Sequence, residues 1–261
     1  MVSVTPATLA SQASAKSDAE PDAKSDAKSD SVRKAALRPR NAATLIILDR
    51  SKKTPKLLMG RRHPGLAFMP GKFVFPGGRI EPGDRHMPVA GALSARATDA
   101  LAAQVPRASH HLGRALALAA IRETYEETGL MLGTREYGPP DSAPEGVWRA
   151  FREAGIMPDL EALHLVARAI TPPGRPRRFD TRFFAVDRKA VAGEAPGIVT
   201  PDSELVELAW VTFAEARSLD LPRITGLVLT DVEAQVAGNL APYLPIPFYY
   251  ERRGKGQREV L

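Results

Sequence analysis

The stretch RETYEETGL, residues 122–130, combines three carboxylates and a guanidinium and then reaches a glycine. The run before it, GRALALAAI, is rich in alanine and leucine, which favour helix. We therefore predict a helix from Leu116 to Thr128, with Gly129 as its C-terminal glycine.

The three glutamates of this stretch share one side of the predicted helix. Glu123, Glu126 and Glu127 are spaced i, i+3 and i+4, and the last turn of a helix already carries negative partial charge. A solvated helix face with an i,i+4 ion pair between Arg122 and Glu126 is the simplest interpretation. A hard divalent cation with oxygen ligands, such as Mg²⁺, accounts better for three clustered carboxylates.

The composition indicates a globular protein with a substantial core. The chain has 261 residues, 44% of them hydrophobic, and contains no cysteine, which excludes disulfides and thiolate metal sites. No apolar run is long enough to cross a membrane, and the first residues lack the pattern of a secretory signal, so we expect a cytoplasmic location and no membrane partner.

The net charge of +6 is compatible with a phosphorylated partner. The arginines are scattered and do not alternate with aromatic residues, so a nucleic-acid surface is disfavoured and a small phosphorylated substrate is preferred. The sequence leaves a homodimer open.

Three regions are expected along the chain. Residues 1–37 contain repeated Lys-Ser-Asp-Ala units and are predicted to be a disordered tail, 38–245 form one domain, and 246–261 form a basic C-terminal tail. Within the domain, expected strands and helices mix without regular alternation. This favours an α+β fold, with a mixed sheet packed between helices.

A second informative stretch is FPGG, residues 75–78. Two glycines directly after an aromatic strand allow a backbone carbonyl to turn towards a ligand, although Pro-Gly-Gly is usually a simple turn. Five residues separate Gly78 from Asp84.

Together, Gly78, Asp84 and RETYEETGL resemble the signature of the Nudix hydrolase family, whose motif is called the Nudix box. Asp84 stands where the family usually has glutamate, and 37 residues separate it from Arg122, far more than in the family. The box would then comprise 78–84 and 122–130, with a helical insertion at 85–113 that forms an excursion, because lengthening a loop costs little. Such an interrupted box is similar to the branch that contains the peroxisomal coenzyme A diphosphatase.

The resemblance implies a Nudix-like α-β-α sandwich and Mg²⁺- or Mn²⁺-dependent hydrolysis of a diphosphate. Glu123, Glu126, Glu127 and the Gly78 carbonyl would hold the metal, and Arg122 would orient a glutamate. Glu123 is the favoured base, with Glu204 and Glu207 as candidates from a later loop.

Coenzyme A or acyl-coenzyme A is the substrate class that this branch implies. ADP-ribose, NADH and dinucleoside polyphosphates stay open, as does a non-catalytic nucleotide sensor or RNA-associated module on the same fold. The residues expected to contact phosphates are Arg61, Arg79, Arg178 and Arg182.

Overall fold

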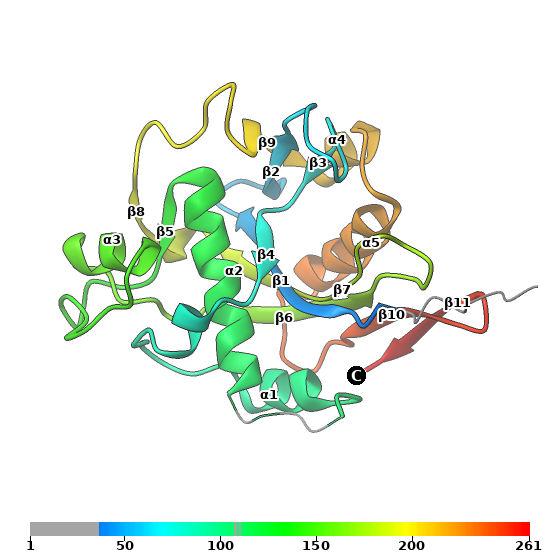
Figure 1. Cartoon of the computed structure of the whole chain (residues 1–261), viewed down its shortest axis with the longest axis horizontal. Coiled ribbons are helices and arrows are strands. Elements are labelled where there is room, and N and C mark those ends of the chain that lie inside the picture. Colours follow the sequence, from blue (N-terminus) through cyan, green and yellow to red (C-terminus); the bar gives the residue numbers. More distant parts are fainter. Residues whose placement is uncertain (1–36, 107–108, 110) are drawn as a thin grey trace, which may run out of the picture. The chain divides into compact units, whose positions relative to one another are not determined.

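The computed structural model describes residues 37–106, 109 and 111–261 (Figure 1). The predicted disordered tail lies outside the described residues, apart from Leu37. None of the helices in these ranges has the length and apolar character needed to span a bilayer.

The strand β1 (Arg40–Asp49) organises the main sheet. It runs parallel to β7 (Phe179–Asp187) on one side and pairs antiparallel with β4 (Gly77–Arg79) and β2 (Lys56–Arg62) on the other. Alternate residues of β1 enter two different apolar clusters, Leu45 one of them and Ile46 the other. The continuous run AATLIIL is thus a strand that is buried on both faces.

The sheet is mixed, as predicted. Its order is β11-β10-β6-β7-β1-β2-β3, with β4 paired to β1 and β9 to β2. The remaining strands are β3 (Phe73–Val74), β6 (His164–Ile170), β9 (Leu205–Thr212), β10 (Pro247–Arg252) and β11 (Lys255–Val260). A separate two-stranded sheet joins β5 (Leu130–Leu132) to β8 (Val191–Glu194).

Helices cover both faces of the main sheet. The cluster on one face contains residues of α1 (Ala95–Ala102), α2 (Leu112–Thr128) and α3 (Val147–Glu153). The cluster on the other face contains residues of α4 (Phe213–Ser218) and α5 (Arg223–Ala237). Short 3₁₀ turns occupy η1 (Pro82–Arg85) and η2 (Arg188–Ala190). The predicted α-β-α sandwich is therefore confirmed.

The predicted central helix is present as α2, and it begins four residues earlier than expected, at Leu112. Every residue from 115 to 121 is buried, so this half of the helix is enclosed on all sides, which explains its many alanines. Gly129 ends the helix with φ 78°, and its N–H donates to the Tyr125 carbonyl. A Cβ on Gly129 would lie 2.3 Å from the Ala195 carbonyl oxygen, so the position requires glycine.

The insertion returns the chain to the box. Ser94 caps α1 by accepting a hydrogen bond from the Ala97 N–H. Leu101 of α1 is buried in the apolar cluster that also contains residues of α2. From the first turns of α2, Arg114 donates to the carbonyls of Arg85 and Met87. These contacts fix η1 beside α2, although most of the insertion separates them in sequence.

The C-terminal segment differs from the expected basic tail. Residues 247–260 form the hairpin β10–β11, and β10 pairs parallel with β6. Phe248 is 3% exposed and packs under the Arg168 guanidinium at 4.5 Å. The aromatic residues that begin the segment therefore join the sheet, and the charged residues follow from Glu251 onwards, most of them exposed.

Candidate active site

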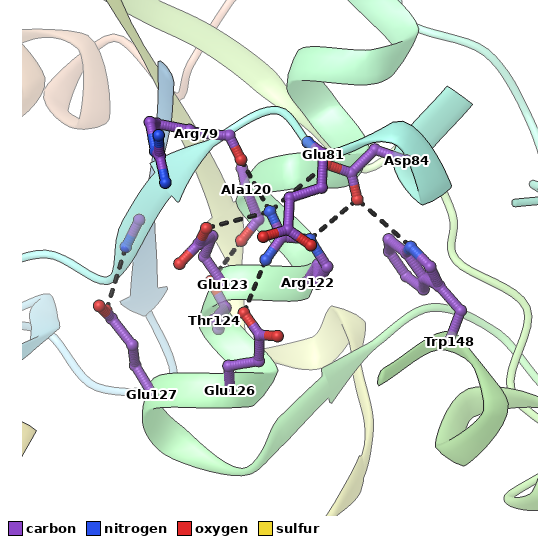
Figure 2. Close-up of polar contacts among 11 residues, drawn as sticks. Arg79, Glu81, Asp84, Ala120, Arg122, Glu123, Thr124, Glu126, Glu127 and Trp148 are labelled. Atoms are coloured by element: carbon purple, nitrogen blue, oxygen red, sulfur yellow. Dashed lines mark hydrogen bonds and ion pairs between the residues drawn. The ribbon is translucent and has the colours of Figure 1, made fainter. Parts of the chain in front are cut away.

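Arg122 is the centre of the candidate site (Figure 2). Its side chain is 3% exposed, and its Nε donates to Asp84 Oδ1 at 2.9 Å. Its Nη1 donates to Glu126 Oε2 at 2.6 Å and its Nη2 to Glu123 Oε1 at 3.0 Å. Burial lowers the pKa of Arg122, but these carboxylates outweigh that effect and raise the pKa above its usual value. The guanidinium thus stays charged and fixes three carboxylates in one place.

Arg122 also joins the two halves of the box. Besides Asp84 it contacts the Arg79 carbonyl, to which Nη2 donates at 2.7 Å. Asp84 is fully buried and accepts two further hydrogen bonds, from the Glu81 N–H at 2.7 Å and from Trp148 Nε1 at 3.2 Å. The two halves of the box are therefore in direct contact despite the long spacer between them in the sequence.

Glu123 lies directly under the glycine corner. A Cβ built on Gly78 would be 2.3 Å from Glu123 Cδ, so a larger residue would collide with the carboxylate. Burial raises the pKa of Glu123 to about 7, against the lowering effect of Arg122 and with further raising by Glu126 and Glu204. A carboxylate with such a pKa can accept a proton near neutral pH.

Glu127 is the most buried glutamate of the box. It is 6% exposed and accepts a hydrogen bond from the Gly77 N–H at 3.1 Å. Burial raises the pKa of Glu127 well above its usual value, and Glu204 and Glu123 raise it further. Its ionised form requires compensation from a cation.

Glu126 is more open, with 37% of its side chain exposed. Burial also raises its pKa, while Arg122 lowers it. This glutamate faces the outer side of the box.

Glu204 and Glu207, the candidates from a later loop, differ in position. Glu204 is bonded to Arg62 at 2.8 Å and is close enough to raise the pKa of both Glu123 and Glu127. Glu207 lies opposite Arg61 in the β2–β9 ladder and pairs with it at 2.8 Å on a half-exposed surface. Glu204 therefore lies close to the glutamates of the box, whereas Glu207 is held by Arg61.

The donor chemistry suits a hard divalent cation, although the ligands are not preassembled. Within the described ranges, no three acidic or histidine side chains are grouped closely enough to hold an ion as they stand. Glu123 and Glu126 are bonded to Arg122, and Glu127 to the Gly77 N–H. These carboxylates are nevertheless the oxygen ligands that Mg²⁺ prefers, and Glu123 raises the pKa of Glu127.

Comparisons with known proteins give similarities to Nudix hydrolases. Human acyl-coenzyme A diphosphatase NUDT19 is 28% identical over 207 residues, which cover 62% of this chain and 54% of that protein. A Caenorhabditis elegans protein named nudix hydrolase 7 is 26% identical over 184 residues, covering 66% of this chain and 51% of its own length. The crystal structure of a NUDIX hydrolase from Alicyclobacillus acidocaldarius superposes with a TM-score of 0.54 at 28% identity and covers 78% of this chain and 93% of that chain. The chain is thus similar in sequence and in structure to Nudix hydrolases.

The chain spans about half the length of the curated relatives named above. No family model matches it. Its interrupted Nudix box gives a physical account of that result, because the contacts between Asp84 and Arg122 are made across 37 intervening residues.

The four arginines expected to contact phosphates have different environments. Arg79 is exposed next to the Nudix box, and the side chain of Arg61 is engaged by Glu207. Arg178 donates to the carbonyls of Thr171 and Leu37, so it anchors backbone.

Arg182 was expected to contact phosphates, and the structure contradicts this expectation. Its side chain is 0% exposed and bonds Asn41 and Asp180, so it cannot touch a substrate directly. Burial lowers the pKa of Arg182 to about 10. Its position in the middle of β7, on the face that α2 covers, explains why an apparently available arginine is enclosed.

Two contributors to the Nudix box were missed by sequence reasoning. Trp148 packs on Phe151, and it also donates a hydrogen bond to Asp84. Arg62 pairs with Glu204 on the side of the box, whereas its neighbour Arg61 points elsewhere. Strand alternation in β2 could have separated the two arginines, whereas no local signal connects Trp148 to Asp84.

Proposed function

We propose that this Nudix protein hydrolyses the diphosphate linkage of a nucleoside diphosphate derivative, with coenzyme A or acyl-coenzyme A as the preferred substrate class. The proposal rests on the cluster around Arg122, in which a buried guanidinium bonds Asp84, Glu123 and Glu126 beside the Gly77–Gly78 corner. The similarity to acyl-coenzyme A diphosphatase NUDT19 supports the substrate class.

The reaction adds water to one phosphorus and breaks the bond from that phosphorus to the bridging oxygen, which yields two phosphomonoesters. Glu123 is the proposed base, since its pKa of about 7 lets it take a proton from water at neutral pH. Arg122 orients the Glu123 carboxylate through the 3.0 Å hydrogen bond from Nη2. Glu204, which raises the pKa of Glu123, is the second candidate for this role.

We assign metal binding to Glu123, Glu126, Glu127 and the Gly78 carbonyl. A bound Mg²⁺ or Mn²⁺ ion would neutralise phosphate charge and lower the pKa of a coordinated water. The high pKa of Glu127 and the absence of a cationic side-chain bond to it among the described contacts make this residue the most dependent on such an ion.

The test is a substrate panel with the purified protein and Mg²⁺. Coenzyme A, acyl-coenzyme A, ADP-ribose, NADH and a dinucleoside polyphosphate are incubated separately, and products are identified by mass. The expected result is 3′,5′-ADP and phosphopantetheine, or its acyl form, from the first two. Preferred cleavage of another member would replace the substrate class, and no cleavage of any would favour the nucleotide sensor or RNA-associated module.

A further inference from the structure

A cavity of about 600 Å³ opens beside the Nudix box, where β1 begins and β4 ends. The box glutamates do not line it, but it begins one residue after Gly78. An extended chain advances at most about 3.6 Å per residue, so Glu81 is within about 11 Å of Gly78. The polar residues that line the cavity are Arg40, Asn41, Arg79, Glu81, Arg85 and His86.

The lining carries an excess of positive charge. Arg40, Arg79 and Arg85 are exposed, and none of them forms an ion pair with any residue that the structure describes. Glu81 supplies the one carboxylate in this lining. Arginines elsewhere near the site, such as Arg62, are paired. Three guanidiniums around one cavity favour an anionic ligand that can accept several hydrogen bonds.

A buried cluster of Arg168, Asp180 and Arg182 adds further positive charge next to the cavity. Asn41 lines the cavity, and its Oδ1 accepts a hydrogen bond from Arg182 Nη1 at 2.8 Å. Arg182 and Arg168 share a single carboxylate, Asp180, at 3.1 and 2.8 Å. Two buried guanidiniums with one carboxylate leave one uncompensated positive charge.

The buried excess is not relieved by hydrogen bonding. Nε and Nη2 of Arg182 find no partner among the described residues. Since an uncompensated charge in a desolvated position is costly, an anion in the adjoining cavity would lower the energy of the cluster. Arg182 would thus attract an anion in the cavity electrostatically, although its buried side chain cannot touch the ligand.

We propose that this basic pocket binds a phosphomonoester group of the substrate, separate from the diphosphate that is cleaved. The inference rests on the proposed function, because it assumes that the diphosphate lies at the Nudix box. Coenzyme A carries such a group, the 3′-phosphate, on the ribose that adjoins its diphosphate. ADP-ribose, NADH and dephospho-coenzyme A lack it, so the pocket selects for the coenzyme A class.

The experiment measures binding without hydrolysis. Calorimetry in EDTA compares 3′,5′-ADP with 5′-AMP, which differ only in the 3′-phosphate, and includes inorganic phosphate alone. The variants are Arg40→Gln and Arg85→Gln, and the control is Arg149→Gln, which removes the same charge from a side chain that is 69% exposed on α3. Circular dichroism checks that each variant is folded.

The wild-type protein should bind 3′,5′-ADP about tenfold more tightly than 5′-AMP, the effect of one charge-assisted contact. Both pocket variants should lose that preference, and Arg149→Gln should keep it. Equal binding of the two nucleotides by the wild type, or an unchanged preference in both variants, would overturn the inference. Inorganic phosphate bound as tightly as 3′,5′-ADP would also overturn it, since the pocket would then be a free-phosphate site. Because no turnover is measured, failed hydrolysis in the substrate panel counts against the proposed function alone.

Discussion

At the scale of the residue, glycine and arginine decide the geometry of the site. Gly78 leaves room for the Glu123 carboxylate, and Arg122 holds that carboxylate from the other side. The sequence motif identified both residues. It could not reveal that Trp148 completes the hydrogen bonding of Asp84, because that contact spans 64 residues and depends on how α3 docks.

The substitution Gly78→Ala should destabilise the protein by about 1–3 kcal/mol, because the new methyl group overlaps the Glu123 carboxylate. Urea unfolding measures the change. Gly226→Ala is the control, since nothing lies within 4 Å of its Cβ and alanine favours the helix. Combining Gly78→Ala with Glu123→Ala should recover part of the loss, and simple additivity of the two costs would contradict the proposed overlap.

Glu123 should make metal-free stability depend on pH. Its folded pKa of about 7 exceeds the ordinary glutamate pKa of 4.5, so between these two pH values the folded state retains this proton while the unfolded state loses it. The free energy of unfolding should therefore fall as pH rises from about 4.5 to 7, by up to about 3 kcal/mol from this group. Unfolding in EDTA at pH 5 and pH 8 compares the wild type with Glu123→Gln, which should be relatively more stable at pH 8. A stability difference that is the same at both values would exclude the assigned pKa.

At the scale of the element, residue patterning predicted α2 and the mixed character of the main sheet. The alanine-rich run that begins α2 stands out because its residues are buried on all sides, which leaves a continuous apolar signal. The pairing of β5 with β8 was not predicted, since three- and four-residue strands carry too few alternations to stand out. The C-terminal hairpin was interpreted as a basic tail because the charges of β11 obscure the buried aromatic residues of β10.

The hairpin should therefore contribute to stability. Phe248→Ala is expected to cost about 3–5 kcal/mol, because Phe248 is buried against Arg168 and stacks on Tyr250. Chemical denaturation provides the measurement. The matched control is Tyr243→Ala, whose aromatic ring is 77% exposed and whose loss should change stability by less than about 0.5 kcal/mol. Equal effects of the two substitutions would show that β10 is not part of the folded core.

At the scale of the whole molecule, the described residues from 37 onwards form one compact unit that contains the Nudix box and both apolar clusters. The motif predicted that the two halves of the box meet across the insertion. It could not predict all of the contacts that do this, since Arg114, which lies outside the motif, donates to the carbonyls of Arg85 and Met87 in addition to the contacts of Arg122. Burial of Arg182 likewise depends on the sheet order, which no local pattern encodes.

Removal of residues 1–36 should leave the unfolding temperature and hydrolytic activity unchanged, as the low-complexity composition of this segment predicts. The truncation keeps Leu37, whose carbonyl accepts from Arg178 at 2.6 Å. Differential scanning calorimetry and the coenzyme A assay measure the outcome. A decrease of several degrees, or a lower rate, would mean that the segment interacts with the rest of the chain.

We propose above that Arg122 and the glutamates around it form a metal-dependent hydrolytic site. The most direct measurement is kcat/KM for coenzyme A hydrolysis with Mg²⁺ in the wild type, in Glu127→Gln, and in Glu153→Gln, a control at an exposed glutamate of α3. Glu127→Gln should lose at least about a hundredfold in kcat/KM while remaining folded, because the substitution removes a buried anionic oxygen from the site. Glu153→Gln should match the wild type. Full Mg²⁺-dependent activity in folded Glu127→Gln would contradict the account.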